Sequence, residues 1–340
     1  MALAAKQWIK RLFLTTFIIV ILPVSAIMGF NFYIDPLWNF SHKNEYNDYQ
    51  IGFDERQQKT NYMNSREHFE YDSLLMGTSR VTYMNEHVFK KEDVFNYSVS
   101  GFRIDEYLPY IQYATEKNGK EFKTIYLELY INSYDKNVKS THQDPSVYIE
   151  KAEDPFYKIT SLFSYNTLQS ALENFKISKA NHYSGPRSYN RENVAQTSYS
   201  NPELWNQFET NFQAAASQPF VYNEEYKAKL IELKNTFPNT KFIVFTDLIP
   251  AKRLEMIVSN EEHRKAYERW FREMIDVFGE IYSFHGTNSV TTNPNNFLDV
   301  FHFYPSIGDQ MIKAIEEPYK HKDILTIVDK EHLHNYLESR

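Results

Sequence analysis

The stretch Tyr71–Ser79, YDSLLMGTS, decides the fold class, because a short apolar run stops at a glycine followed by two hydroxyl residues. An apolar run of four to eight residues that ends in a turn is typical of a buried strand. The same arrangement recurs along the chain, with a small or polar residue after each run. The further runs are Val94–Val99, Phe122–Ile131, Lys241–Thr246 and Glu280–Phe284.

Helical patterns separate these runs, near residues 104–118, 223–236 and 260–278, and a last helix opens at Pro305. Short apolar runs divided by helices predict an α/β fold with a central parallel sheet and right-handed crossovers. Residues 133–220 form an insert that is too long for a loop. We expect it to be a lid or subdomain over the sheet edge, with helical pieces around 159–178.

The N-terminus contains 23 residues without a charge, Leu12–Ile34. At about 1.5 Å per residue, a helix of this length crosses a hydrocarbon core of about 30 Å. Three basic residues precede the run, and the first charge after it is Asp35, so residues 1–11 are expected in the cytoplasm and the remainder outside. A cleaved signal peptide, ending near Val24-Ser25-Ala26, is the alternative. A buried core helix fits less well, since the run has no polar face.

The composition excludes several classes of protein. The 340 residues include 44 acidic and 37 basic side chains, for a net charge of −7, and no cysteine. A general nucleic-acid binder would carry a basic excess. Without cysteine there is no disulfide, thiolate zinc site, iron–sulfur cluster or cysteine nucleophile. The sequence indicates no metal and no cofactor, and covalent catalysis would depend on another nucleophile such as serine.

Polar residues with useful chemistry follow the predicted strands. Ser79 lies on the turn after the first strand, Gly101 follows the second and Asn132 the third, while Asp299 and His302 precede the last helix. The carboxyl ends of parallel strands form one edge of a sheet, where ligands bind. Serine, histidine and aspartate in this order can act as nucleophile, base and orienting carboxylate. Backbone N–H groups and an amide can stabilise an oxyanion.

Each of these signals has an ordinary structural alternative. A glycine-threonine-serine tripeptide after a strand is often only a turn, and a histidine among aromatic residues is often structural. The D-x-x-H spacing also occurs at Asp329 and His332, where we expect a solvated face of an amphipathic helix formed by the tail, residues 321–340. The order of Ser79, Gly101, Asn132 and the Asp299–His302 pair along the predicted strands favours a catalytic site.

That order resembles the SGNH (GDSL-like) hydrolase superfamily over about residues 70–320. The matching blocks are GTSR at 77–80, SVSG at 98–101, LYIN at 129–132 and DVFH at 299–302. The first block has Thr78 in place of the usual aspartate, and the third has no glycine before Asn132. The resemblance implies a three-layer α/β/α sandwich after a single transmembrane helix and a juxtamembrane segment, residues 35–69.

The resemblance also implies roles for individual residues. Ser79 would be the nucleophile, His302 the base and Asp299 its orienting carboxylate. The N–H groups of Ser79 and Gly101, with the amide of Asn132, would form the oxyanion hole.

One-helix anchors followed by an external domain of this type resemble the branch linked to surface-polymer O-acylation. That branch includes alginate O-acetylation and teichoic-acid D-alanyl transfer proteins. The expected partners are a surface polysaccharide or teichoic-acid-like polymer and a polytopic membrane-bound O-acyltransferase, because acyl-CoA stays in the cytoplasm. Arg80 is a candidate to bind an anionic polymer group, or else a salt-bridge residue. An esterase or deacetylase, and a non-catalytic partner, are the alternative functions.

Overall fold

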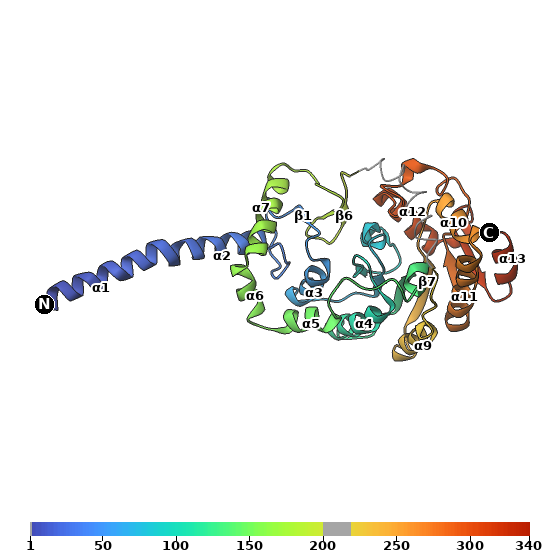
Figure 1. Cartoon of the computed structure of the whole chain (residues 1–340), viewed down its shortest axis with the longest axis horizontal. Helices are drawn as coiled ribbons and strands as arrows, with labels where there is room; N and C mark the ends of the chain where they lie inside the picture. The colour runs from blue at the N-terminus through green and yellow to red at the C-terminus, as the bar shows by residue number, and fades with distance from the viewer. Residues whose placement is uncertain (1, 200–218) are drawn as a thin grey trace. The chain divides into compact units, whose positions relative to one another are not determined.

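The computed structural model describes residues 2–199 and 219–340, and part of the predicted insert, 200–218, lies outside the described residues. The chain is a mixed α/β protein (Figure 1). It divides into two compact units. Unit 1 comprises Met1–Glu67, Tyr148–Ser184 and Ser188–Arg191. Unit 2 comprises His68–Val147, Gly185–Arg187 and Glu192–Arg340.

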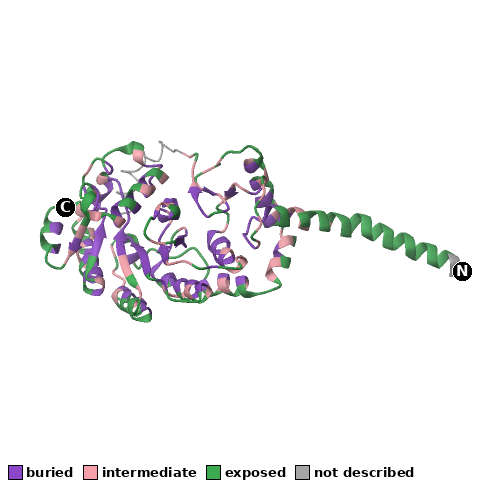
Figure 2. Ribbon diagram, turned by 180° about the vertical axis from the view of Figure 1, so that it is seen from behind, coloured by how far each residue is buried: buried purple, intermediate pink, exposed green. Residues whose placement is uncertain are grey.

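Unit 1 begins with one long apolar helix, built from α1 (Ala2–Thr16), a π turn η1 (Phe17–Ile21) and α2 (Leu22–Ile34). Its span Ala4–Ile34 is long and apolar enough for a membrane anchor or a signal sequence. Figure 2 shows it exposed along most of its length. Pro23 explains the π turn, because its ring would clash with a carbonyl four residues earlier and the wider turn avoids this.

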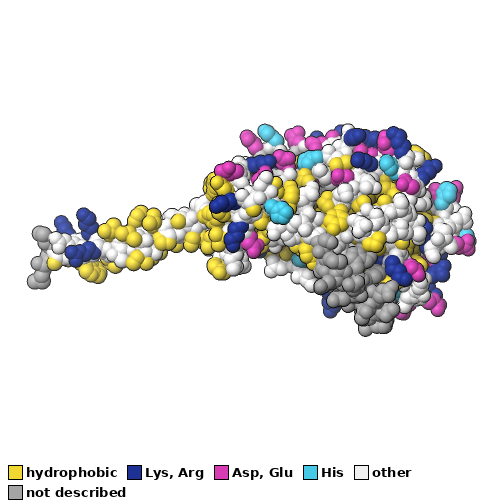
Figure 3. Space-filling model, turned by 90° about the horizontal axis from the view of Figure 1, so that it is seen from above, with side chains coloured by type: hydrophobic (Ala, Val, Ile, Leu, Met, Phe, Trp, Pro, Cys, Tyr) yellow, Lys and Arg dark blue, Asp and Glu magenta, His cyan; other side chains and the backbone are white. Residues whose placement is uncertain are grey.

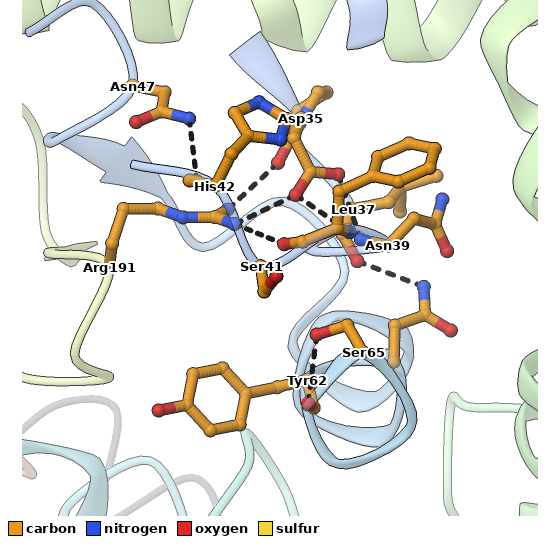
Figure 4. Close-up of polar contacts among 12 residues, drawn as sticks. Asp35, Leu37, Asn39, Ser41, His42, Asn47, Tyr62, Ser65 and Arg191 are labelled. Atoms are coloured by element: carbon orange, nitrogen blue, oxygen red, sulfur yellow. Dashed lines mark hydrogen bonds and ion pairs between the residues drawn. The ribbon is translucent and has the colours of Figure 1, made fainter. Parts of the chain in front are cut away.

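A buried ion pair marks the point where α2 ends. Asp35 has the left-handed φ of 50°, and its carboxylate accepts hydrogen bonds from the N–H groups of Asn39 (2.8 Å) and Phe40 (3.1 Å). The Arg191 guanidinium donates to the same carboxylate at 2.8 Å (Figure 4). Both side chains are buried. The end of the apolar helix is thereby fixed to a segment that comes 156 positions later.

The polar segment that follows is folded, although its sequence predicted only a juxtamembrane stretch over 35–69. Helix α3 (Glu55–Ser65) buries most of its polar side chains. Gln57 donates to Tyr148 O (3.1 Å), and Asn61 donates to Leu37 O (2.9 Å), so buried amides are compensated by backbone carbonyls. Strand β1 (Gln50–Ile51) pairs with β5 (Ser188–Tyr189) in antiparallel fashion.

Residues 148–184 join the N-terminal segment in unit 1, so the predicted lid or subdomain is not a compact unit of its own. The pattern over 159–178 correctly indicated helices. The helices between residues 145 and 179 are α5 (Pro145–Glu153), α6 (Tyr157–Thr160), the short η5 (Ser161–Phe163) and α7 (Tyr165–Lys179). Both η5 and α7 pack against α2.

Unit 2 contains a six-stranded sheet with the order β3-β2-β4-β7-β8-β9. Its first five strands are parallel, as the apolar runs predicted. Strands β2 and β4 are wholly buried, as expected for parallel strands covered on both faces. The strands are β2 (Ser73–Met76), β3 (Val94–Asn96), β4 (Thr124–Leu129), β7 (Lys241–Thr246), β8 (Glu280–Ser283) and β9 (Thr326–Asp329).

Four predicted helices of unit 2 are present, and the C-terminal tail differs from its prediction. They are α4 (Ile104–Asn118), α9 (Tyr226–Thr236), α11 (Glu261–Phe278) and α12 (Pro305–Glu316). The tail contains strand β9, antiparallel to β8, before the short helix α13 (Leu333–Glu338). The expectation of one helix was wrong because this short stretch gains more from pairing with the open edge of β8. A further helix, α10 (Ala251–Ser259), precedes α11.

Candidate active site

Three adjacent strands bring the predicted oxyanion residues to one edge of the sheet. Ser79 follows β2, which lies between β3 and β4, while Gly101 follows β3 and Asn132 follows β4. The N–H of Val99 donates to the carbonyl of Gly77 (3.1 Å) and extends the β2–β3 pairing beyond the strands. The parallel register therefore places Gly101 and Asn132 on opposite sides of the turn that carries Ser79.

The turn of Ser79 depends on a close approach at Gly77. A Cβ atom at this position would lie 2.4 Å from Cγ2 of Val81 and 2.8 Å from Cβ of Glu128. The absence of a side chain lets the chain leave β2 directly into the short helix η2 (Val81–Tyr83). The hydroxyl of Thr82 donates to the carbonyl of Ser79 (2.6 Å) and closes this turn.

A second glycine, Gly308, lets the helix that follows His302 approach the turn of Ser79 closely. Helix α12 packs on η2, and a Cβ atom at Gly308 would lie 2.6 Å from the carbonyl oxygen of Tyr83. No real side chain fits at this distance from backbone. Since α12 begins directly after the loop of His302, this close contact sets how near the imidazole comes to Ser79.

The loop before α12 is stiffened by its own hydrogen bonds. Phe297 and Phe303 form an isolated antiparallel bridge, and the N–H of Leu298 donates to the carbonyl of His302 (2.8 Å). One oxygen of Asp299 accepts the N–H groups of Phe301 (2.7 Å) and His302 (2.8 Å). The D-x-x-H spacing thus forms a tight turn that aims the carboxylate back at its own histidine.

Serine, histidine and aspartate form a continuous chain of hydrogen bonds. The distance from Ser79 Oγ to His302 Nε2 is 2.8 Å, and His302 Nδ1 lies 3.0 Å and 2.9 Å from the two oxygens of Asp299. The predicted contact between Ser79 and His302 is confirmed. Burial lowers the pKa of the His302 imidazole, although Asp299 acts in the opposite direction. The hydrogen bond from His302 helps to hold the pKa of Asp299 below its usual value. A neutral imidazole can accept the serine proton.

The second D-x-x-H pair is an internal comparison. His332 Nδ1 lies 2.7 Å from Asp329 Oδ1, and the N–H of His332 also donates to that oxygen, so the local turn is the same. Both side chains are solvent-exposed, in agreement with the expected solvated position. The pair does not lie within a helix, because Asp329 is the last residue of β9 and His332 is the residue before α13. The spacing alone produces the Asp–His contact, and the fold around Ser79 distinguishes the first pair.

Arg80 does not have the surroundings expected for a substrate ligand. Its guanidinium forms ion pairs with Glu128 (3.2 Å) and Asp247 (3.1 Å), and its side chain is 7% exposed. Both of these carboxylates are buried as well. The positive charge is compensated inside the protein, so these contacts support the salt-bridge alternative for Arg80 and not the binding of a polymer group.

Arg187 is the cation that does lie beside Ser79, and sequence reasoning missed it. One nitrogen of its guanidinium donates to the carbonyl of Ser79 (3.2 Å), and another donates to the hydroxyl of Ser100. These bonds connect the turn after β2 with the turn after β3. Its charge also lowers the pKa of His302. Arg187 comes from the aperiodic insert, where no pattern marks a functional residue.

Arg253 is a second missed residue. It lies on α10, is 4% exposed, and its Nη2 is 3.5 Å from the side-chain oxygen of Asn132. Its guanidinium also lies 4.5 Å from the ring centre of Phe301. Burial lowers its pKa to about 10. A donor on the oxygen of an amide leaves the NH₂ group to face the other way, so Arg253 sets the orientation of Asn132.

The backbone N–H groups of Ser79 and Gly101 lie near the same turn. Gly101 has a φ of +62°, a left-handed conformation that glycine adopts without strain. Among the residues that the structure describes, none accepts a hydrogen bond from the N–H of Ser79 or of Gly101. The N–H groups of Ser79 and Gly101 thus have no acceptor in the described part of the chain, and Asn132 follows the neighbouring strand at the same edge of the sheet.

Comparisons with known proteins add little to this geometry. No protein-family model and no curated protein matches the chain. A solved structure from Streptococcus pneumonia, described provisionally as a platelet activating factor, shares 13% identity over 78% of this chain and 90% of that chain. A TM-score of 0.38 is too low to indicate a shared fold or a shared activity.

Proposed function

We propose that this protein is an SGNH-type serine acyltransferase, with the three-layer arrangement of that superfamily, that O-acylates a polymer of the bacterial cell surface. Residues 12–34 would anchor it, with the catalytic part outside. The observation that carries the proposal is the hydrogen-bonded series Ser79–His302–Asp299 at the carboxyl ends of the strands. The polymer would be a polysaccharide or a teichoic-acid-like chain.

The reaction would proceed in two half-reactions. His302 Nε2 accepts the proton of Ser79 while Oγ attacks the carbonyl carbon of the acyl donor, and the leaving group departs with that proton. The acyl group is then an ester on Ser79. In the second half, Nε2 takes a proton from an acceptor hydroxyl, whose oxygen attacks the ester, and Ser79 recovers the proton. Asp299 stabilises the imidazolium in both halves.

The negative oxygen of each tetrahedral intermediate would be held by the donors beside Ser79. They are the N–H groups of Ser79 and Gly101 and the amide of Asn132. Such donors stabilise the transition state more than the substrate, because charge develops on that oxygen only during the reaction.

The acyl donor would reach the outer face through a partner. Acyl-CoA is charged and stays in the cytoplasm, and this chain has no cysteine on which to carry a thioester. A polytopic membrane-bound O-acyltransferase would pass the acyl group across. If water replaces the acceptor hydroxyl, the same site acts as an esterase or deacetylase, so the test must separate these outcomes.

The test uses the full chain in detergent micelles or nanodiscs. A fluorophosphonate should phosphonylate Ser79 and p-nitrophenyl acetate should be turned over, and both should be lost in Ser79→Ala. The matched control is Ser306→Ala, at an exposed serine of α12. Turnover that survives Ser79→Ala contradicts the proposal. Acetate released without transfer to any added glycan favours the esterase, whereas polymer binding without labelling or turnover favours a non-catalytic partner.

A further inference from the structure

Unit 1 exposes large apolar side chains within one short part of the chain. Ordinary soluble surfaces expose such residues singly. Here they follow one another along α6, η5 and the first half of α7. The side chains and their exposed fractions are Phe156 (69%), Ile159 (52%), Phe163 (54%), Tyr165 (70%) and Leu172 (43%). We call them the apolar surface of 156–172.

This surface lies beside the end of the apolar N-terminal helix. Helix α2 packs against η5 and α7, and the side chain of Asn31 donates to the carbonyl of Leu162 (2.8 Å). Phe30 meets the ring of Phe175 edge-on, with ring centres 5.9 Å apart. Figure 3 shows hydrophobic side chains, with lysine or arginine among them, gathered where the helix meets the body. The apolar surface of the helix therefore continues onto unit 1.

The length of the helix indicates the depth in a bilayer at which the contact between α2 and η5 would lie. From Leu12, the first residue after the basic cluster, a rise of about 1.5 Å per residue reaches the outer limit of a hydrocarbon core of about 30 Å near Asn31. The bond from Asn31 to Leu162 places η5 at that level. Aromatic side chains are enriched at this depth, where apolar chains meet headgroups.

We propose that the apolar surface of 156–172 inserts into the outer interface of the lipid bilayer and forms a second membrane contact beside the anchor. The side chains of Phe156, Ile159 and Phe163 would enter the acyl boundary, and Lys158, between the first two, would meet lipid phosphates. This inference rests on the anchoring part of the proposed function and not on its acyl chemistry.

The absence of cysteine makes the test direct, since each introduced cysteine is the only thiol in the chain. The full chain, carrying Phe163→Cys or Ile159→Cys with an NBD label, is reconstituted into phosphatidylglycerol–phosphatidylcholine vesicles. Spin labels on lipids, either near the headgroup or deep in the acyl chains, quench NBD at matching depth. Val20→Cys reports on the anchor, and Tyr319→Cys, 81% exposed in unit 2, is the control.

The expected result is blue-shifted emission and quenching by shallow spin labels at positions 163 and 159, deep quenching at 20, and neither effect at 319. Quenching at 20 while 163 and 159 behave like 319 overturns the lipid contact and leaves the anchor intact. No quenching at 20 overturns the anchor and this surface together. A blue shift at positions 163 and 159 that occurs only in native membranes, and not in lipid vesicles, overturns the lipid contact and indicates a protein partner instead. None of these outcomes depends on acyl turnover.

Discussion

The guanidinium of Arg80 and the carboxylate of Glu128 form a buried ion pair (3.2 Å) directly behind the turn that carries Ser79. The other oxygen of Glu128 accepts the N–H of Thr78 at 2.6 Å, so one carboxylate holds the residues before and after Ser79. Asp247 completes the compensation of Arg80 (3.1 Å). The turn is fixed by charges that are almost wholly buried.

Replacing Arg80 should therefore cost stability. Arg80→Gln leaves two buried carboxylates without their cation, and loss of one partner of a buried ion pair costs about 3–5 kcal/mol. Denaturant unfolding of the full chain should show this loss, whereas Lys252→Gln, which removes an exposed cation, should stay within about 0.5 kcal/mol of wild type. Unchanged stability with a raised KM would restore Arg80 to substrate binding.

The pH dependence of turnover should reflect the environment of His302. Its neutral form accepts the proton, and burial together with the charges of Arg80 and Arg187 lowers its pKa. Activity should therefore persist below pH 6.5 and fall as the pH drops through the lowered pKa. Arg187→Gln removes one positive charge, so the acid limb of kcat/KM should move to higher pH.

The control for this prediction is Lys322→Gln, which removes an exposed cation from the C-terminal segment. It should leave the acid limb unchanged. The position of the limb is the readout, because Arg187→Gln also removes a bond to Ser79 O and can lower the rate for that reason. A limb that does not move in Arg187→Gln contradicts the assignment of His302 as the titrating base.

A methyl group at position 308 should separate the base from the nucleophile. Gly308→Ala meets the backbone of Tyr83, which cannot rotate away, so α12 must shift. Overpacking of this kind costs about 1–3 kcal/mol, and turnover should fall because His302 moves with the start of α12. The control is Gly286→Ala, whose methyl meets only the flexible end of Arg340 at 3.3 Å. Equal activity in the two variants would contradict this role.

Asn132 and Arg253 should act as one unit. If the amide is an oxyanion donor, Asn132→Ala should lower turnover about 10²–10³-fold. Arg253→Gln should lower turnover in the wild-type background, because the amide loses its orientation, and add little in the Asn132→Ala background. A double-mutant cycle on kcat/KM measures this coupling. Strictly multiplicative losses would show that Arg253 acts elsewhere.

The sequence contained enough information for the parallel sheet and for the contact between Ser79 and His302. Apolar runs that end at small polar residues mark parallel strands, because both faces of such strands are buried and each strand ends at the ligand edge. Ser79 and His302 could be paired across the chain for this reason. The close approach of Gly308 to the backbone of Tyr83, which supports this contact, could not be predicted, because no local pattern indicates it.

The missed elements are those whose stability comes from distant partners. Helix α3 is polar yet buried, because Gln57 and Asn61 bond to carbonyls far along the chain. Strand β9 exists because β8 offers an open edge. Arg187 lies in a segment without periodicity, and Arg253 lies on α10, a helix that carries no motif. The contacts of both residues come from what the fold places beside them.

The ion pair between Asp35 and Arg191 also sets when unit 1 can finish folding during synthesis of the chain. In synthesis from the N-terminus Asp35 is made first, while its guanidinium partner follows 156 residues later. Until then its carboxylate has no cation, and unit 1 lacks the segments 148–184 and 188–191. Unit 1 can therefore close only once the chain has been made as far as residue 191, and a chain cut before that position should unfold at a lower denaturant concentration than the full chain.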